Sequence, residues 1–213
     1  MSSMWRIAVI FPALMAVSTS GSAQYTQYSP PPTSSGYSYT SNINAWISNW
    51  RTLRQSSGYR FSDYATFLIA NPDWPDSAKM RRWAEAAMVP GENSGMVIAF
   101  FNSKKPTTGN SWARLADAYA ASGRMVDATN AARGAWASDD LSATDEQAIW
   151  ARYGRSFTTA DHDRRIDALL SAKRADDAAR FITMATPGRQ AVFGARVAML
   201  RGDADADTRY SSV

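Results

Sequence analysis

Apolar residues recur every three or four positions along almost the whole chain from residue 41 onward. The first such stripe lies on one face of a helix and is formed by Ile43, Trp46, Ile47, Trp50 and Leu53. No segment shows the strict apolar–polar alternation of a half-buried β-strand. The stripes occur in short segments that begin at capping residues and end near glycine or proline. The sequence therefore predicts an all-α fold, with further helices near 62–71, 76–89, 94–101, 111–123, 124–138, 143–153, 159–172, 174–185 and 188–200.

Helices joined by such short connections tend to pack as antiparallel neighbours. When each pair leaves an apolar face, successive pairs stack to bury it and form a solenoid. The segment WARLADAYAASGRMVDAT (112–129) has the Trp, Leu and Tyr spacing and the Gly-Arg turn of a tetratricopeptide pair. The other predicted pairs do not repeat it at a fixed period. We therefore expect residues 41–213 to form an irregular, tetratricopeptide-like α-α superhelix of antiparallel helix pairs.

The first 40 residues differ in composition from the rest of the chain. An arginine precedes an apolar stretch at 7–17, and small residues follow it. This pattern predicts a secretory signal peptide over residues 1–23, cleaved between Ala23 and Gln24. The apolar stretch is too short to span a bilayer, so we expect no membrane segment in the mature chain and a location in the periplasm. Residues 24–40, rich in Ser, Tyr and Pro, are expected to form a disordered linker.

Composition excludes several kinds of chemistry. The 213 residues include no cysteine and a single histidine, His162, which excludes cysteine nucleophiles, thiolate metal sites and multi-histidine metal sites. The net charge of +4 is not carried by any run of lysine or arginine, so we expect no nucleic-acid partner. Asp203, Asp205 and Asp207 alternate as in a calcium loop, but the closing glutamate is missing. No phosphate-binding or dinucleotide-binding glycine motif occurs, and we predict no cofactor or metal.

The glutamates and the histidine give no active-site pattern. Glu85 and Glu146 lie on predicted helices, and we expect solvated side chains rather than the paired carboxylates of a glycosidase. His162 lies between Asp161 and Asp163 and could act as a base with an orienting acid. All three fall in the first turn of a predicted helix, where acidic side chains complement the helix dipole. We therefore favour a role in starting the helix and in hydrogen bonds between helices.

Most of the eight tryptophans fit the core better than a sugar-binding platform. Trp74 is the exception, because it lies in the loop NPDWPD (71–76) between Pro72 and Pro75. The tryptophans that fall on apolar helix faces are Trp46, Trp50, Trp83, Trp112, Trp136 and Trp150.

Four segments resemble the N-terminal helical part of the soluble lytic murein transglycosylases. They are FSDYATFLIANPDWPDSAKMRRWAEAAM (61–88), VIAFFNSKKPTTGNSWARLADAYAASGR (97–124), RGAW (133–136) and TTADHDRRIDALL (158–170). The resemblance implies a long α-superhelix, U- or ring-shaped, that precedes a lysozyme-like C-terminal domain. In that family the C-terminal domain cleaves peptidoglycan between N-acetylmuramic acid and N-acetylglucosamine and leaves 1,6-anhydro ends.

The sequence departs from this family at the catalytic domain. The family's catalytic glutamate lies in a Glu-Ser motif, and this chain has no Glu-Ser dipeptide, so no catalytic residue is carried over. We expect the scaffold of a larger enzyme or a truncated product, inactive alone, with peptidoglycan and a lysozyme-like domain as partners. We also expect no capping helix in RGDADADTRYSSV at the end.

Positive and aromatic side chains are the candidates for contact with the glycan or its stem peptides. We predict this contact for Trp74 and for four arginines expected to be exposed, Arg81, Arg82, Arg164 and Arg165. The alternative function is that of a stand-alone exported adaptor that binds another protein through a concave groove.

Overall fold

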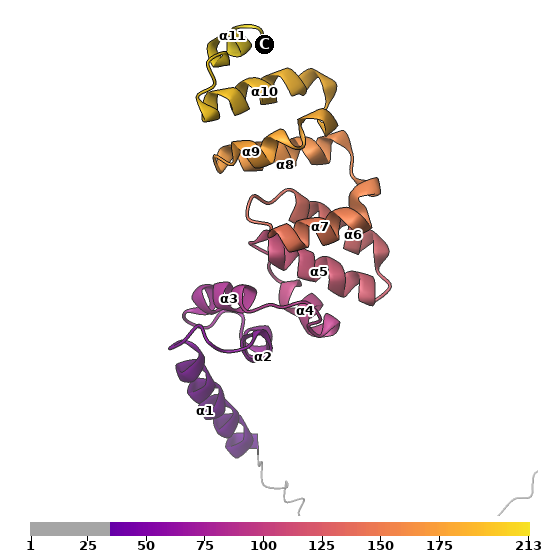
Figure 1. Cartoon of the computed structure of the whole chain (residues 1–213). Coiled ribbons are helices and arrows are strands. Elements are labelled where there is room, and N and C mark those ends of the chain that lie inside the picture. The colour runs from indigo at the N-terminus through magenta and orange to yellow at the C-terminus, as the bar shows by residue number, and fades with distance from the viewer. Residues whose placement is uncertain (1–34) are drawn as a thin grey trace, which may run out of the picture.

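The computed structural model describes residues 35–213, with side chains placed from residue 42 onward. These residues form an all-α fold without β-strands, as predicted (Figure 1). The α-helices are α1 (Ser35–Leu53), α2 (Phe61–Ala70), α3 (Ser77–Ala86), α4 (Ser94–Phe101), α5 (Gly109–Ala121), α6 (Met125–Trp136), α7 (Ala143–Tyr153), α8 (Thr159–Ser171), α9 (Ala175–Ala179), α10 (Pro187–Arg201) and α11 (Ala206–Ser211). Two 3₁₀ turns, η1 (Gly154–Ser156) and η2 (Ile182–Met184), complete the list.

The first described helix begins earlier than expected. Residues 35–40 were assigned to the disordered linker but form the start of α1. The helix begins three positions after Pro32, the last of the prolines that disfavour helix, and serine and tyrosine have only moderate helix propensity rather than a blocking effect. The expected signal peptide at 1–23, its cleavage site and linker residues 24–34 lie outside the described residues.

Side-chain caps set the starts of four helices. Asn93, Thr108, Ser142 and Thr158 each accept a hydrogen bond from the backbone N–H three residues further on, at the starts of α4, α5, α7 and α8. The cap of α5 is thus Thr108, not Ser111 as the sequence suggested. Gly123 and Gly202 follow α5 and α10 with φ of +74° and +73°, the left-handed conformation that suits glycine at a helix end.

Two predictions near the C-terminus are wrong. The single helix expected at 174–185 is the short helix α9 followed by η2. The final segment, expected to lack a capping helix, contains α11, which packs on α10. Aspartate and alanine alternate over residues 203–207 and form no apolar stripe, so the spacing of apolar residues did not predict this helix.

Each helix packs mainly on the one or two helices before and after it in the chain (Figure 1). The closest pair is α5 and α6, whose facing alanines are buried and let the two backbones approach. Trp136 is fully buried, and most of the other predicted core tryptophans are half-buried against the core, whereas Trp150 is exposed. None of the described helices is long and apolar enough to cross a membrane.

Candidate functional site

Trp74 lies in a surface pocket of about 460 Å³ between α1 and the loop that joins α2 to α3. This volume is within the range of small-ligand sites. Helix α1 contributes side chains from consecutive turns of one face, and the loop contributes the opposite wall. The lining residues are Ile47, Trp50, Arg51, Asp73, Trp74 and Pro75.

The two indole rings of the pocket are fixed by their neighbours. The Nε1–H of Trp50 donates a 2.8 Å hydrogen bond to the carbonyl oxygen of Pro75, which ties α1 to the loop. Trp74 packs edge-on against Trp50, with ring centroids 6.3 Å apart, and against the buried Phe67 at 5.4 Å. Both rings therefore offer a surface that is ordered before any ligand binds.

Charged side chains surround this aromatic surface. The guanidinium of Arg54 lies 4.4 Å from the ring centre of Trp50 and forms a 2.9 Å ion pair with Asp76. Asp76 has φ of +62°, so the loop enters α3 through a sharp turn. Arg51 and Asp73 are exposed on the rim and form no ion pair with any residue from 42 to 213. The pocket can thus stack a flat or ring-shaped apolar face and hydrogen-bond polar groups at its edge.

Of the two arginines on α3, only Arg82 is exposed. Arg81 is half-buried and donates from Nη2 to the carbonyl oxygens of Phe100 at 2.6 Å and Lys104 at 3.0 Å. Its guanidinium also lies 4.1 Å from the ring centre of Phe100. Burial lowers the pKa of Arg81, and the nearby charge of Glu85 partly offsets that effect. Arg81 therefore holds the end of α4 and the following loop, and its expected exposure is wrong.

Glu85 is buried, which contradicts the expectation of a solvated side chain. Its Oε2 accepts hydrogen bonds from the backbone N–H and the hydroxyl of Thr107, both at 2.8 Å. A carboxylate that leaves water must gain such partners to offset its desolvation. Glu85 thus anchors the chain just before α5 to α3, and it is a structural residue.

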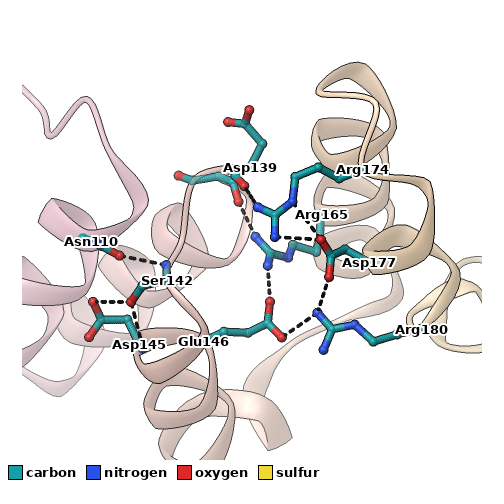
Figure 2. A network of polar contacts seen from close by, with 10 residues as sticks. Asn110, Asp139, Ser142, Asp145, Glu146, Arg165, Arg174, Asp177 and Arg180 are labelled. Carbon is teal, nitrogen blue, oxygen red and sulfur yellow. Dashed lines mark hydrogen bonds and ion pairs between the residues drawn. The ribbon is translucent and has the colours of Figure 1, made fainter.

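Arg165, from the other predicted arginine pair, lies at the junction between α7 and α8 (Figure 2). Arg165 is fully buried, pairs with Glu146 and donates to the carbonyl oxygen of Ser138. Arg180 binds the second oxygen of Glu146 at 3.0 Å. Arg165 therefore cannot reach a glycan in this conformation, and Glu146 is an ion-pair partner rather than a free solvated carboxylate. Arg164 is exposed and pairs with Asp161.

The polar cluster at the start of α8 has the structural role predicted for it. Asp161 closes a capping box, accepting from the N–H and hydroxyl of Thr158 at 2.8 and 2.9 Å. Asp163 accepts from the N–H and hydroxyl of Thr186, before α10, at 2.9 and 2.8 Å. Burial alone would raise the pKa of each carboxyl, but these hydrogen bonds and nearby arginines outweigh it and lower both pKa values.

His162 lies among aromatic rings, with Trp150 and Trp136 centred 5.8 and 5.9 Å from its own. Its Nδ1 has no hydrogen-bond partner among the described residues. Burial lowers the pKa of His162, although the charges of Asp161 and Asp163 act in the opposite direction. An imidazole in this position packs as a neutral aromatic group.

Of the five predicted contact residues, only Trp74 lines this pocket. Arg82 and Arg164 are exposed on other parts of the surface. Trp50, Arg51 and Asp73 were not predicted to belong to a site. Trp50 was assigned to the core by its helical spacing, and only the neighbouring Arg51 could have suggested that it lies near the surface. No group of acidic or histidine side chains among residues 42–213 is arranged to hold a metal ion. Compared with known proteins, the chain matches no family model, no curated protein and no solved structure.

Proposed function

We propose that this chain is a non-catalytic, superhelical binding scaffold of a murein-cleaving enzyme, and that it holds the peptidoglycan glycan strand in the periplasm. The helices pack mainly on their neighbours in the chain, which is the packing expected of a tetratricopeptide-like solenoid. The four sequence segments that resemble lytic transglycosylases suggest the ligand and a lysozyme-like domain as the catalytic partner.

The observation that carries the proposal is the pocket formed by Trp50 and Trp74. A pyranose ring presents an apolar face of C–H groups and an edge of hydroxyl and amide groups. The fixed indole rings suit the apolar face, and Arg51 and Asp73 at the rim suit the polar edge. The proposal does not require a second aromatic pocket of this kind. A long polymer can be retained by this pocket together with several weaker contacts elsewhere on the scaffold.

Co-sedimentation of the purified protein with peptidoglycan sacculi tests the proposal. Trp74→Ala should weaken retention about fivefold, the equivalent of about 1 kcal/mol for one aromatic stacking contact. Trp150→Ala is the matched control, because Trp150 is also a partly exposed tryptophan but lies on α7, outside the pocket. Circular dichroism should confirm that both variants are folded.

The outcomes separate the parts of the proposal. Equal retention of the two variants would refute the pocket as the contact, and no retention of the unaltered protein would refute glycan binding. Release of 1,6-anhydro products from sacculi by the protein alone would refute the non-catalytic role.

A further inference from the structure

A second groove, separate from the Trp74 pocket, runs between α5, α6 and the loop after α4. Its volume is about 430 Å³. Helix α5 contributes Trp112, Leu115 and Tyr119, which lie on successive turns, and α6 contributes Asp127, Asn130 and Ala131. The last residue of α4, Phe101, and the loop residues Asn102, Lys105 and Pro106 complete the lining.

The position of the Trp112 ring depends on a glycine in the facing helix. A Cβ added at Gly134 would lie only 2.6 Å from Cδ2 and 2.7 Å from Cε3 of Trp112. The ring therefore rests directly on the backbone of α6, where any side chain would displace it. Two turns further along α5, the ring centre of Tyr119 lies 4.4 Å from the guanidinium of Arg124. Both aromatic rings of the groove are thus ordered by contacts within the protein.

The loop that carries Lys105 is held from behind by α3. Arg81 binds the carbonyl oxygens of Phe100 and Lys104, and Glu85 binds Thr107. These bonds fix the backbone on both sides of Lys105. The backbone of the loop therefore loses little conformational entropy when a ligand binds to the ammonium group of Lys105, which lines the groove.

The free polar groups of the groove favour an anion. Asp127 is neutralised by Arg124, whose Nε lies 2.8 Å from its Oδ2. The Oδ1 of Asn130 accepts a 3.1 Å hydrogen bond from Arg133, which leaves the side-chain N–H₂ of Asn130 to donate. Lys105 is exposed and forms no ion pair with any residue from 42 to 213. The groove therefore offers the hydrogen-bond donors of Lys105 and Asn130 together with the aromatic rings of α5.

We propose that this groove binds an extended acidic peptide segment, with a carboxylate of the peptide at Lys105. An apolar side chain of the peptide packs between Trp112 and Tyr119. The side-chain N–H₂ of Asn130 donates to a carbonyl oxygen of the peptide, and the carboxamide of Asn102 can both donate to and accept from the peptide backbone. The charge pattern favours this ligand over an uncharged sugar, which would gain no ion pair with the ammonium of Lys105. The inference is independent of the glycan pocket.

Titration of the ¹⁵N-labelled protein with small probes, followed by NMR, tests the inference at millimolar concentrations where weak binding is visible. Three probes share one sequence plan: acetyl-Ala-Leu-Ala with a free carboxylate, acetyl-Ala-Leu-Glu amide, and acetyl-Ala-Leu-Ala amide. At least one carboxylate peptide should shift the indole N–H of Trp112 and the side-chain amide of Asn130. The neutral peptide should not shift them. The first two probes distinguish a C-terminal carboxylate from a glutamate side chain.

A matched pair of lysine variants locates the charge. Lys105→Glu should weaken binding of the carboxylate peptide about tenfold or more. Lys104→Glu makes the same charge change at the neighbouring exposed residue, which does not line the groove, and should change binding by less than about threefold.

Three results would overturn the inference. They are equal effects of the two lysine variants, equal binding of the neutral and acidic peptides, and an absence of shifts with every peptide. Chitobiose serves as the sugar probe. If it alone shifted the Trp112 and Asn130 signals, the groove would be assigned to a glycan instead, whereas the outcome of the Trp74 experiment would be unaffected.

Discussion

Two helical glycines provide a sharp test of the packing described above. Gly134 in α6 and Gly194 in α10 both lie inside helices, so replacing either with alanine adds the same methyl group and the same helix propensity. That propensity gain is about 1 kcal/mol in a helix interior. The surroundings differ, because a Cβ at Gly134 would lie 2.6 Å from Trp112, whereas a Cβ at Gly194 has no atom within 4 Å.

This difference in surroundings sets the expected change in the free energy of unfolding for each variant. Gly194→Ala should raise the free energy of unfolding by up to about 1 kcal/mol. Gly134→Ala gains the same propensity but must displace an indole ring, and inserting a methyl group into packed surroundings costs about 1–3 kcal/mol. The two variants should therefore differ in stability by about 1–3 kcal/mol. For a chain of this size, each 1 kcal/mol corresponds to about 2–4 °C in Tm.

Urea unfolding followed by far-ultraviolet circular dichroism measures the difference. A second substitution checks its cause: with Trp112→Ala already in place, Gly134→Ala should become neutral or stabilising, because the clash has been removed. Equal stabilisation by Gly134→Ala and Gly194→Ala in the unaltered background would refute the close contact between Trp112 and α6. The groove proposed above would then lose its ordered wall.

Three further predictions concern buried polar groups. Arg165→Ala should lower the free energy of unfolding by about 3–5 kcal/mol, because the carboxylate of Glu146 loses its buried partner. Arg180→Ala, at the exposed end of the same network, should lower it by less than about 1 kcal/mol, and urea titrations compare the two variants. Glu85→Ala should cost about 1–3 kcal/mol by leaving the N–H and hydroxyl before α5 unpaired, and should speed hydrogen exchange of residues 102–108. Because burial lowers the folded-state pKa of His162, its contribution to stability is complete above about pH 6.5 and falls as the pH drops below that value. His162→Phe should therefore flatten this part of the pH profile of Tm. An unchanged profile would refute the lowered pKa of His162.

Local patterns in the sequence were sufficient to predict most of the helices. The segments expected at 94–101 and 143–153 coincide with α4 and α7. In both cases a capping side chain directly precedes the helix, Asn93 for α4 and Ser142 for α7. The helices that were missed or divided, α9 and α11, are five and six residues long and carry little apolar surface. Short helices of this kind depend on neighbouring helices for stability, which local spacing does not report.

The candidate contact residues were harder to predict because charge and burial conflict. Arg165 was expected to be exposed, yet it lies on the apolar face of α8, three residues after His162 and directly before the buried Ile166. That spacing was a usable signal that an arginine belonged to the interior. The partner of Arg165 on another helix could not be found in this way, because Glu146 lies 19 residues earlier and the ion pair depends on how α7 meets α8.

For the Trp74 pocket, too, the sequence predicted one part of the site but not its partner on another element. The two prolines around Trp74 correctly predicted a loop, and Trp74 was predicted to contact the glycan because it lies in that loop rather than on a helix face. The second wall is formed by Trp50, 24 positions earlier, and the hydrogen bond from Trp50 to Pro75 joins them. The pocket depends on how α1 is oriented relative to the loop, and the local spacing of residues does not determine that orientation.

A recurring polar device accounts for ordered junctions in a chain without a fixed sequence repeat. Glu85 on α3 binds both the N–H and the hydroxyl of Thr107, just before α5, and Asp163 on α8 binds the same two groups of Thr186, just before α10. In each case a carboxylate reaches past one short helix to hold the start of the next long one. Charge-assisted hydrogen bonds are directional and stronger than neutral ones, so a single carboxylate can fix the relative placement of two helices. The apolar residues between them are then free to vary in type and spacing. The two junctions thus share one arrangement, although the helix sequences around them do not repeat at a fixed period.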